Sequence, residues 1–272
     1  MNQGNEQERI DQEIRLKENM SKIKQVFLVM SGKGGVGKST VAVNLAYTLA
    51  LKGKKTGIMD IDLHGPNIAK MLGIEGKTIL SDEFGIVPVK VNENLKAISL
   101  ALFGTKQDAP FIWRGPMKSG AIKQFLSDVH WGELDYLIID SPPGTGDEPL
   151  SVCQFIPKIS GAVIVSTPQD VAVLDARKSI QFARELRIPI AGIIENMSGY
   201  FCPHCQKEVN LFKKGGAENA AEEMHVPFLG RIPFDPEMVE LGDRGTPFVS
   251  HQSGSLSVKA FEEIVRLIEE QK

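Results

Sequence analysis

Short, almost continuously apolar segments alternate with longer, helix-length segments along most of this 272-residue chain. The apolar segments predict β-strands because they combine strand length with many Val, Ile and Leu residues. The predicted strands are Val26–Ser31, Lys55–Asp60, Leu95–Leu100, Asp135–Asp140, Gly161–Thr167 and Ile190–Asn196, with a shorter one in Phe228–Pro233. Continuous apolar runs, rather than alternating ones, are typical of parallel strands that helices cover on both faces.

Helices are predicted between these strands, as in Ser39–Lys52 and in Val171–Arg187, which ends before Pro189. Regular alternation of strands and helices predicts one doubly wound α/β domain with a mostly parallel sheet, spanning residues 23–272. Residues 1–22 are polar and charged, and we expect them to form a partly helical arm. The last helix, in the sequence SLSVKAFEEIVRLIEEQK, has one apolar face and a mixed-charge polar face. We expect it to pack on the sheet, since a membrane-surface helix favours a basic polar face.

The charge and apolar content of the chain exclude several classes of partner. Lys and Arg number 31 against 34 Asp and Glu, which gives a net charge of −3. This balance argues against nucleic-acid binding, which usually needs a basic surface. No apolar run approaches the roughly 18 residues of a membrane span, and the polar N-terminus has no signal-peptide core. Three cysteines are too few for a disulfide framework. We therefore expect a cytoplasmic protein without a membrane partner.

The segment SGKGGVGKST, residues 31–40, carries two overlapping motifs. Gly32, Gly34 and Gly37 form the G-x-G-x-x-G pattern of dinucleotide sites, with Asp60 at the end of the next strand. The same residues also form G-x-x-x-x-G-K-S, a P-loop, in which Lys38 and Ser39 are required. A nicotinamide site gives no reason for that Lys-Ser pair, so the sequence predicts a P-loop NTPase.

A second motif supports the P-loop about a hundred residues downstream. Asp140 ends the apolar strand YLIID and is followed by the turn SPPGTGD. A carboxylate at the end of such a strand is typical of the Mg²⁺ partner in P-loop enzymes. We expect Ser39 and Asp140 to hold Mg²⁺, Asp140 through a water molecule. The backbone N–H groups of the loop are expected to bind the phosphates of ATP. The residues assigned to this role are Gly32, Lys33, Gly34, Gly35, Val36, Gly37, Lys38, Ser39 and Thr40.

Cys202-Pro203-His204-Cys205 forms a C-x-x-C motif after the sixth predicted strand. A dithiol redox pair is disfavoured, because that motif belongs at a helix start in a thioredoxin-like unit. Tetrahedral Zn²⁺ and [4Fe–4S] sites both take four protein ligands, and this motif supplies two thiolates. Either histidines such as His204 or a second chain would complete the site, and coordination chemistry leaves zinc and cluster both open. Cys153 lies among apolar residues and is predicted to be a packing residue.

The loop form K-G-G-x-G-K-S, with its additional Lys33, resembles the deviant P-loop of the family that contains MinD, ParA and the nitrogenase iron protein. The resemblance implies a nucleotide-dependent homodimer in which Lys33 reaches the partner's phosphates, while Lys38 contacts those of its own chain. In the segment MDIDLHGPN, it assigns Asp62 to orienting the attacking water. Asp60, at the strand end, is then a structural residue or an indirect partner of the metal.

Longer segments are more specific. Residues 114–151, together with STPQDVAVLDARK and ENMSGYFCPHC, closely resemble the Mrp/ApbC family of iron–sulfur cluster carrier ATPases. This resemblance covers nearly the whole chain, and it implies a [4Fe–4S] cluster bridged by Cys202 and Cys205 of both subunits. It also implies that Asn196 reads the adenine edge, with Pro233 and Asp235 completing the pocket. No cysteine-rich segment precedes the P-loop, so we expect no second cluster site.

The sequence thus predicts a homodimeric, Mg²⁺-dependent ATPase that carries an iron–sulfur cluster to apo-proteins. Two alternatives remain at this stage. One is a spatial-organising ATPase of the MinD/ParA type, in which the C-x-x-C motif would have no role. The other is a nucleotide-binding dimer module joined by Zn²⁺.

Overall fold

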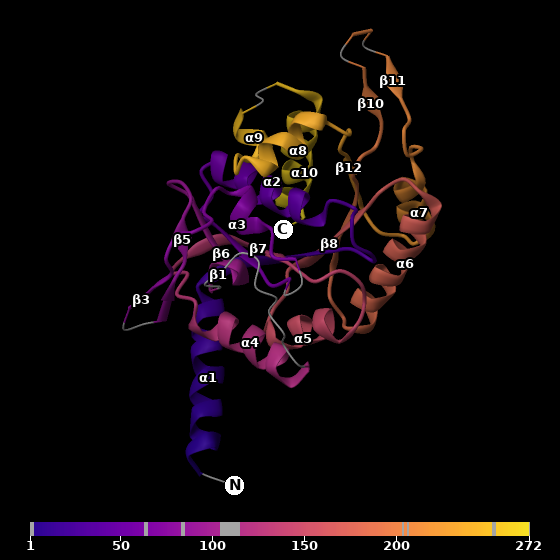
Figure 1. Cartoon of the computed structure of the whole chain (residues 1–272). Helices are drawn as coiled ribbons and strands as arrows, with labels where there is room; N and C mark the ends of the chain where they lie inside the picture. The colour runs from indigo at the N-terminus through magenta and orange to yellow at the C-terminus, as the bar shows by residue number, and fades with distance from the viewer. Residues whose placement is uncertain are drawn as a thin grey trace.

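The computed structural model describes residues 3–62, 65–82, 85–103, 115–202, 204–205, 207–251 and 254–271. An eight-stranded sheet lies at its centre, in the order β12-β9-β8-β1-β7-β2-β6-β5 (Figure 1). The strands are β1 (Ile23–Met30), β2 (Thr56–Asp60), β5 (Val89–Lys90), β6 (Leu95–Ser99), β7 (Leu134–Asp140), β8 (Gly161–Ser166), β9 (Ile190–Glu195) and β12 (Phe228–Arg231). The six longest predicted strands are confirmed, with ends within three residues of the prediction.

The sheet is parallel except at one edge. β1 lies between β7 and β8 and pairs with both in parallel register, and β2 pairs in parallel with β7 and β6. Only the short edge strand β5 runs antiparallel among the described strands of this sheet, with Val89 opposite Ala97. The mostly parallel, doubly wound sheet is therefore confirmed. Parallel strands end at a common edge, and ligands of such sheets bind there.

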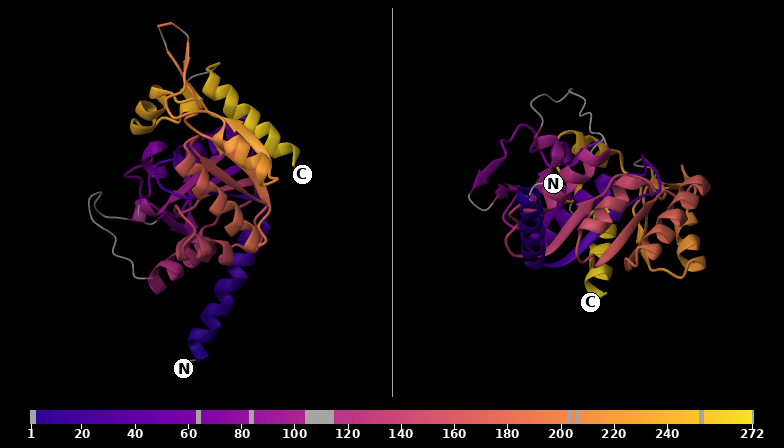
Figure 2. Two further views of the ribbon diagram at one scale, coloured as in Figure 1. Left: turned by 90° about the vertical axis from the view of Figure 1, so that its right-hand side faces the viewer. Right: turned by 90° about the horizontal axis from the view of Figure 1, so that it is seen from below.

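Helices cover both faces of the sheet, as the views in Figure 2 show. The described helices are α1 (Gln3–Ser21), α2 (Lys38–Leu51), α3 (Ile68–Met71), α4 (Gly115–Asp128), α5 (Asp147–Phe155), α6 (Asp170–Glu185), α7 (Gly216–Glu223), α8 (Pro236–Asp243), α9 (Phe248–His251) and α10 (Leu256–Glu270), with a 3₁₀ helix at Leu100–Phe103. None of the helices within the described ranges is long and apolar enough to cross a membrane. Two antiparallel hairpins stand outside the central sheet: β3 (Leu80–Asp82) with β4 (Gly85–Val87), and β10 (Tyr200–Phe201) with β11 (Glu208–Val209).

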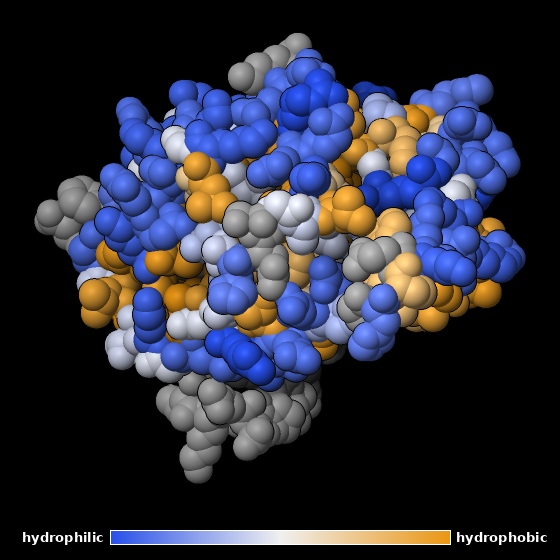
Figure 3. All heavy atoms as spheres, turned by 90° about the horizontal axis from the view of Figure 1, so that it is seen from above, coloured by the Kyte–Doolittle hydropathy of each residue, from blue (hydrophilic) through white to orange (hydrophobic). Residues whose placement is uncertain are grey.

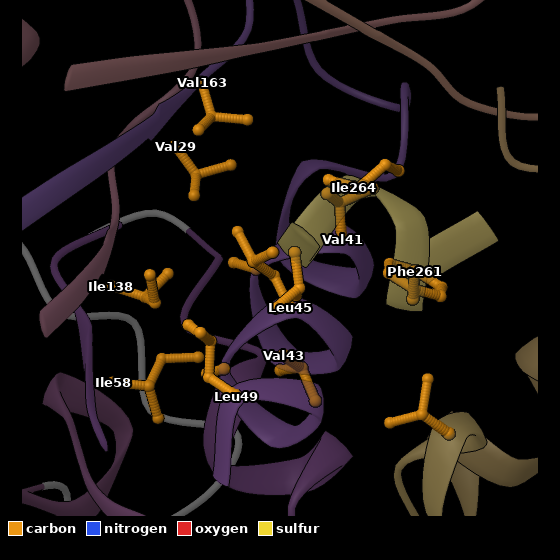
Figure 4. Close-up of a cluster of buried hydrophobic side chains, with 14 of the residues drawn as sticks. Val29, Val41, Val43, Leu45, Leu49, Ile58, Ile138, Val163, Phe261 and Ile264 are labelled. Carbon is orange, nitrogen blue, oxygen red and sulfur yellow. The ribbon is translucent and has the colours of Figure 1, made fainter. Parts of the chain in front are cut away.

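Two hydrophobic cores form, one on each face of the sheet. The first contains Val41, Leu45 and Leu49 of α2, which lie between the strands and α10 (Figure 4). The second lies under helices α4 to α7 and includes Phe125 and Ile180. Side chains on both faces of the strands are buried, which explains their continuous apolar sequences.

The predicted N-terminal arm forms the long helix α1, whose first half projects from the body (Figure 1). Its second half packs against the rest of the protein, since Leu16 and Met20 are buried. The Asn19 side-chain amide donates a hydrogen bond to the Ser127 carbonyl at 2.6 Å. Lys123 and Glu13 add an ion pair at 3.4 Å. The end of α1 is thereby attached to α4.

The last helix packs as predicted. Ser255 caps α10 by accepting a hydrogen bond from the Val258 N–H at 3.1 Å. The predicted apolar face is buried, with Val258, Phe261, Val265 and Ile268 each at most 6% exposed. Phe261 and Ile264 point toward α2 (Figure 4), so α10 holds the P-loop helix against the sheet.

We predict that Phe261→Ala lowers the free energy of unfolding by about 3–5 kcal/mol, because it leaves a cavity between α10 and α2. Denaturant titration followed by circular dichroism measures this loss. Leu256→Ala is the matched control on the same helix; its side chain is 52% exposed, and we expect a change below about 1 kcal/mol. Equal losses in the two variants would contradict this account of the core.

Candidate functional site

The loop from Ser31 to Gly37 connects β1 to α2 and requires glycine at two positions. Gly37 has a φ of 81°, and a Cβ there would lie 2.2 Å from the Asn196 amide nitrogen. A Cβ on Gly32 would lie 2.2 Å from the backbone oxygen of Asp175 in α6. The Asn196 amide donates to the Val36 carbonyl at 2.9 Å. The loop is thus held closely between α6 and the end of β9.

The start of α2 is open to a ligand. No side chain caps its first N–H groups, and Gly34 and Gly35 are exposed. Uncapped N–H groups at a helix N-terminus favour an anion such as phosphate. The turn after β7 lies against the same loop, since the Gly144 N–H donates to the Ser31 carbonyl at 2.8 Å. These features suit a phosphate-binding loop.

Four charged side chains meet at the ends of β2 and β7. Asp60 and Asp140 are register partners at the last positions of these neighbouring strands. Lys38 Nζ lies 2.6 Å from Asp140 Oδ1 and 3.8 Å from Asp62 Oδ2. All four residues are at most 7% exposed. The predicted Lys38, Asp62 and Asp140 are therefore brought together, and Asp60 joins them.

Burial changes the acidity of these carboxyl groups. Burial, and next the charge of Asp140, raise the pKa of Asp60 to about 8, although hydrogen bonds from Ser99, Ile68 and Asp62 oppose the shift. Burial also raises the pKa of Asp140, against the effects of Lys38 and Ser39. Burial next to one another therefore disfavours the ionised forms of Asp60 and Asp140, although Lys38 pairs with Asp140. Such a site favours an additional cation.

The donor set fits Mg²⁺. Asp140 Oδ2 is buried and has no hydrogen-bond partner among the described residues. A hydrogen bond from the Ser39 side chain lowers the pKa of the same carboxyl group. Carboxylate and hydroxyl oxygens are ligands that Mg²⁺ prefers. Asp60 has another task, because its oxygens accept the N–H groups of Asp62 and Ile68 at 3.1 and 3.2 Å. It shapes the turn that carries Asp62; Leu63 and His64 of that turn lie outside the described residues.

A pocket of about 140 Å³ lies beside the start of α2. It is lined by four of the predicted nucleotide-binding residues: Thr40, Asn196, Pro233 and Asp235. The Asp235 carboxylate caps α8 by accepting the Glu237 N–H at 3.1 Å. Sequence reasoning missed most of the apolar lining, which comes from Met71, Met197, Phe234, Met238, Pro247 and Phe248. These residues belong to segments that are distant in sequence, and only folding brings them together.

Lys33, predicted to act on a partner subunit, is half-buried in the loop. Its carbonyl accepts the Ser31 hydroxyl at 2.9 Å. Across the described part of the chain, no carboxylate forms an ion pair with its ammonium group. Lys33 thus differs from Lys38, which two carboxylates of the same chain contact.

The C-x-x-C motif occupies the turn of the β10–β11 hairpin, which projects from the body above β12 (Figure 1). Cys205 is exposed and Cys202 is half-buried; Pro203 lies outside the described residues. The Cys202 N–H donates to the Lys207 carbonyl at 3.0 Å, which closes the turn. Within the described residues, no group of three or more His, Cys, Asp and Glu side chains could hold a metal ion.

The pKa values of Cys202 and Cys153 are shifted in opposite directions. Hydrogen bonds from the Cys205 and His204 backbone N–H groups lower the pKa of Cys202, because they stabilise its thiolate. Burial raises the pKa of Cys153 to about 12. Cys153 also packs against the second core, as predicted. Of these two thiols, Cys202 in the hairpin is therefore the more reactive.

Comparison with known proteins places the chain in a family. The model of the NUBPL iron-transfer P-loop NTPase family matches residues 22–269. An iron–sulfur cluster carrier protein of Methanocaldococcus jannaschii is 54% identical over 257 residues, which cover 94% of this chain and 87% of the relative. The cytosolic Fe-S cluster assembly factor CFD1 of Yarrowia lipolytica is 50% identical over 226 residues, covering 81% and 78%.

Solved structures show the same fold. A nucleotide-binding protein from Archaeoglobus fulgidus in complex with ADP superposes with a TM-score of 0.77 at 40% identity, covering 86% of this chain and 92% of that one. The cell division ATPase MinD of Pyrococcus furiosus gives a TM-score of 0.64 at 23% identity, covering 92% and 100%. At that identity the second likeness concerns the fold alone.

We predict that iodoacetamide at pH 8 modifies Cys202 at least about a hundredfold faster than Cys153, because only thiolates react. Peptide mass spectrometry over time gives both rates. The rate at Cys202 should begin to rise at a lower pH than for an ordinary cysteine, since its pKa is lowered. Comparable rates at the two thiols would contradict the assignment.

Proposed function

Because the chain belongs to the NUBPL iron-transfer P-loop NTPase family, we propose that it is an ATPase that carries an iron–sulfur cluster to apo-proteins. Its relatives are named iron–sulfur cluster carrier and cytosolic Fe-S cluster assembly factor, which supports the family predicted from the sequence. The protein's cargo is then the cluster, and its nucleotide is ATP.

The observation that carries this proposal is the C-x-x-C hairpin on a P-loop NTPase fold. Cys202 and Cys205 lie together in an exposed turn, and the lowered pKa of Cys202 favours the thiolate that binds iron. Two thiolates fill half of a [4Fe–4S] site. A second copy of the chain supplies the same two ligands across a two-fold axis. We therefore propose a homodimer with one cluster bridged by Cys202 and Cys205 of both copies.

The nucleotide half of the proposal rests on the charged cluster at the ends of β2 and β7. Lys38 would neutralise phosphate charge, and Ser39 and Asp140 would hold Mg²⁺. When bound, Mg²⁺ supplies positive charge that orients the phosphates and stabilises the transferring phosphoryl group. Asp62 is suited to orient the attacking water, because its carboxylate lies 3.8 Å from Lys38, which would contact the phosphates. The pocket around Asn196, Pro233 and Asp235 suits the base.

Lys33 has a different proposed role. Its ammonium group would reach the phosphates bound by the second copy, so that ATP joins the two subunits. Binding of ATP or ADP would then shift the dimer between two arrangements, provided that each nucleotide has a different affinity for them. A change in dimer arrangement alters the spacing of the two hairpins. In this way hydrolysis would change how tightly the bridging cluster is held.

We predict that Lys38→Ala lowers ATP turnover at least about a hundredfold and weakens binding of ADP, because the phosphates lose their buried cation. Lys33→Ala should leave ADP affinity within about twofold while lowering turnover at least about tenfold, since its target is the partner's nucleotide. Phosphate release and calorimetry measure these quantities. Normal turnover in Lys38→Ala would overturn the P-loop assignment, and normal turnover in Lys33→Ala would overturn its role across the dimer.

Anaerobic reconstitution should yield about four iron and four sulfide ions per dimer, because one cubane takes two thiolates from each copy. Iron, sulfide and zinc analysis with size-exclusion chromatography measures both cluster content and dimerisation. Cys202→Ser should lose the cluster, whereas Cys153→Ser, the matched control, should keep it. Stoichiometric zinc without iron would favour the zinc-joined dimer and contradict the carrier proposal.

A further inference from the structure

Glu195 is a fully buried carboxylate that the nucleotide chemistry does not use. It is the last residue of β9 and is 0% exposed. Its Oε1 accepts the Ser198 hydroxyl at 2.5 Å and the Gly215 N–H at 2.8 Å. Its Oε2 accepts the Ala217 N–H at 2.8 Å, and Arg231 Nε lies 3.4 Å from Oε1. A carboxylate with this many donors is held in one geometry.

The donors to Glu195 lie on both sides of the cysteine hairpin. Ser198 precedes β10, whereas Gly215 and Ala217 follow β11. One carboxylate therefore joins the two ends of the segment that carries Cys202 and Cys205. The hairpin strands are two residues each, and a two-stranded ribbon of that size is marginal by itself. The direction in which the hairpin projects thus depends on contacts at its base.

The residue that follows Glu195 belongs to the predicted nucleotide site. The next residue, Asn196, lines the base pocket and donates its amide to the Val36 carbonyl of the P-loop. Phe234 lines the same pocket. Its ring lies edge-on to Tyr200 of β10 and to Phe212 after β11, with centroids 6.2 and 6.4 Å apart. Phe234 therefore lies both in the wall of the pocket proposed for the nucleobase and against the two ends of the hairpin segment.

We propose that Glu195 is a positioning residue that makes the placement of the cysteine hairpin depend on the nucleotide. A base in the pocket moves or immobilises Asn196 and Phe234, and the Glu195 contacts transfer that change to both ends of the hairpin. This inference rests on the proposed function, because it assigns the link between its nucleotide and thiol halves. The view from above in Figure 3, on the side of the hairpin and α8, shows hydrophobic patches separated by hydrophilic surface.

The test compares Cys202 alkylation in the cluster-free protein with and without saturating Mg²⁺ and ADP. In the wild type, ADP should change the iodoacetamide rate constant at Cys202 at least about fivefold, the lower end of typical coupling between sites. In Glu195→Gln, the Cys202 rate constants measured with and without ADP should differ by less than about twofold, so that their ratio approaches one. The ADP dissociation constant should change less than about threefold, since Glu195 does not line the pocket. A merely structural role would change both rates together and leave their ratio intact.

Two further variants complete the experiment. Ser198→Ala removes one donor and keeps the carboxylate, so it should lower the ratio without abolishing it. Its result decides the question if Glu195→Gln does not fold. Glu223→Gln is the matched control, because Glu223 lies on the same helix α7 but pairs with Arg177, which is not among the groups around Glu195. It should keep the wild-type ratio.

The outcomes separate this inference from the proposed function. An unchanged ratio in Glu195→Gln, or in Ser198→Ala when the first variant is unfolded, overturns the role of Glu195. Wild-type rates that ADP leaves unchanged overturn it as well. Failure of the wild type to bind ADP overturns the proposed function, and this inference with it. Failure to reconstitute a cluster affects the proposed function alone, because the alkylation ratio needs no cluster.

Discussion

The buried ion pair between Lys38 and Asp140 is the contact on which the site depends. It joins the first residue of α2 to the last residue of β7 at 2.6 Å, and so attaches the P-loop to the sheet. Desolvation of two charges is costly, and a buried pair is weak evidence for stability. Asp62 lies near the same ammonium group, and Asp60 is buried beside Asp140. The arrangement makes physical sense as a site prepared for ligands, because a divalent cation would stabilise the ionised carboxylates and Lys38 would offset phosphate charge.

The parallel sheet supplies the geometry for the rest. Because β1, β2, β7 and β9 run in one direction, they deliver the P-loop, Asp60, Asp140 and the Glu195–Asn196 pair to the same edge. These groups stand on strands buried on both faces, so their relative positions are rigid. The cysteine hairpin stands apart from this rigid edge and is attached to it through few contacts. The rigid charged cluster at the strand ends and the more loosely attached cysteine hairpin therefore lie in adjacent parts of the protein.

Sequence patterns predicted the elements whose signal is local. Long apolar runs identified the parallel strands, and the motif around Lys38 and Ser39 predicted the P-loop, beside which the structure places Asp140. The short hairpins and β5 were missed, because strands of two or three residues carry too little apolar pattern to stand out. The apolar wall of the base pocket was missed because it draws on α3, α8 and α9, far apart in sequence. Glu195 was missed for a similar reason: at the end of a strand it looks like any polar residue, and only its burial, its three hydrogen-bond donors and the nearby Arg231 set it apart.

A carrier must release what it binds, and the hairpin suits that need. Metal–thiolate bonds exchange by attack of incoming thiolates, which requires access to the site. Cys205 is exposed, and both thiols lie in a turn that only two short strands support. A site closed by four ligands of one chain would hold its cluster more firmly and would have no dependence on a second copy. In the proposed homodimer, splitting the ligands between two marginal hairpins would make retention of the cluster depend on how the two subunits are arranged. The contacts suited to control this arrangement lie at the start of each hairpin, where Phe234 lines the nucleotide pocket and Glu195 holds the flanking segments.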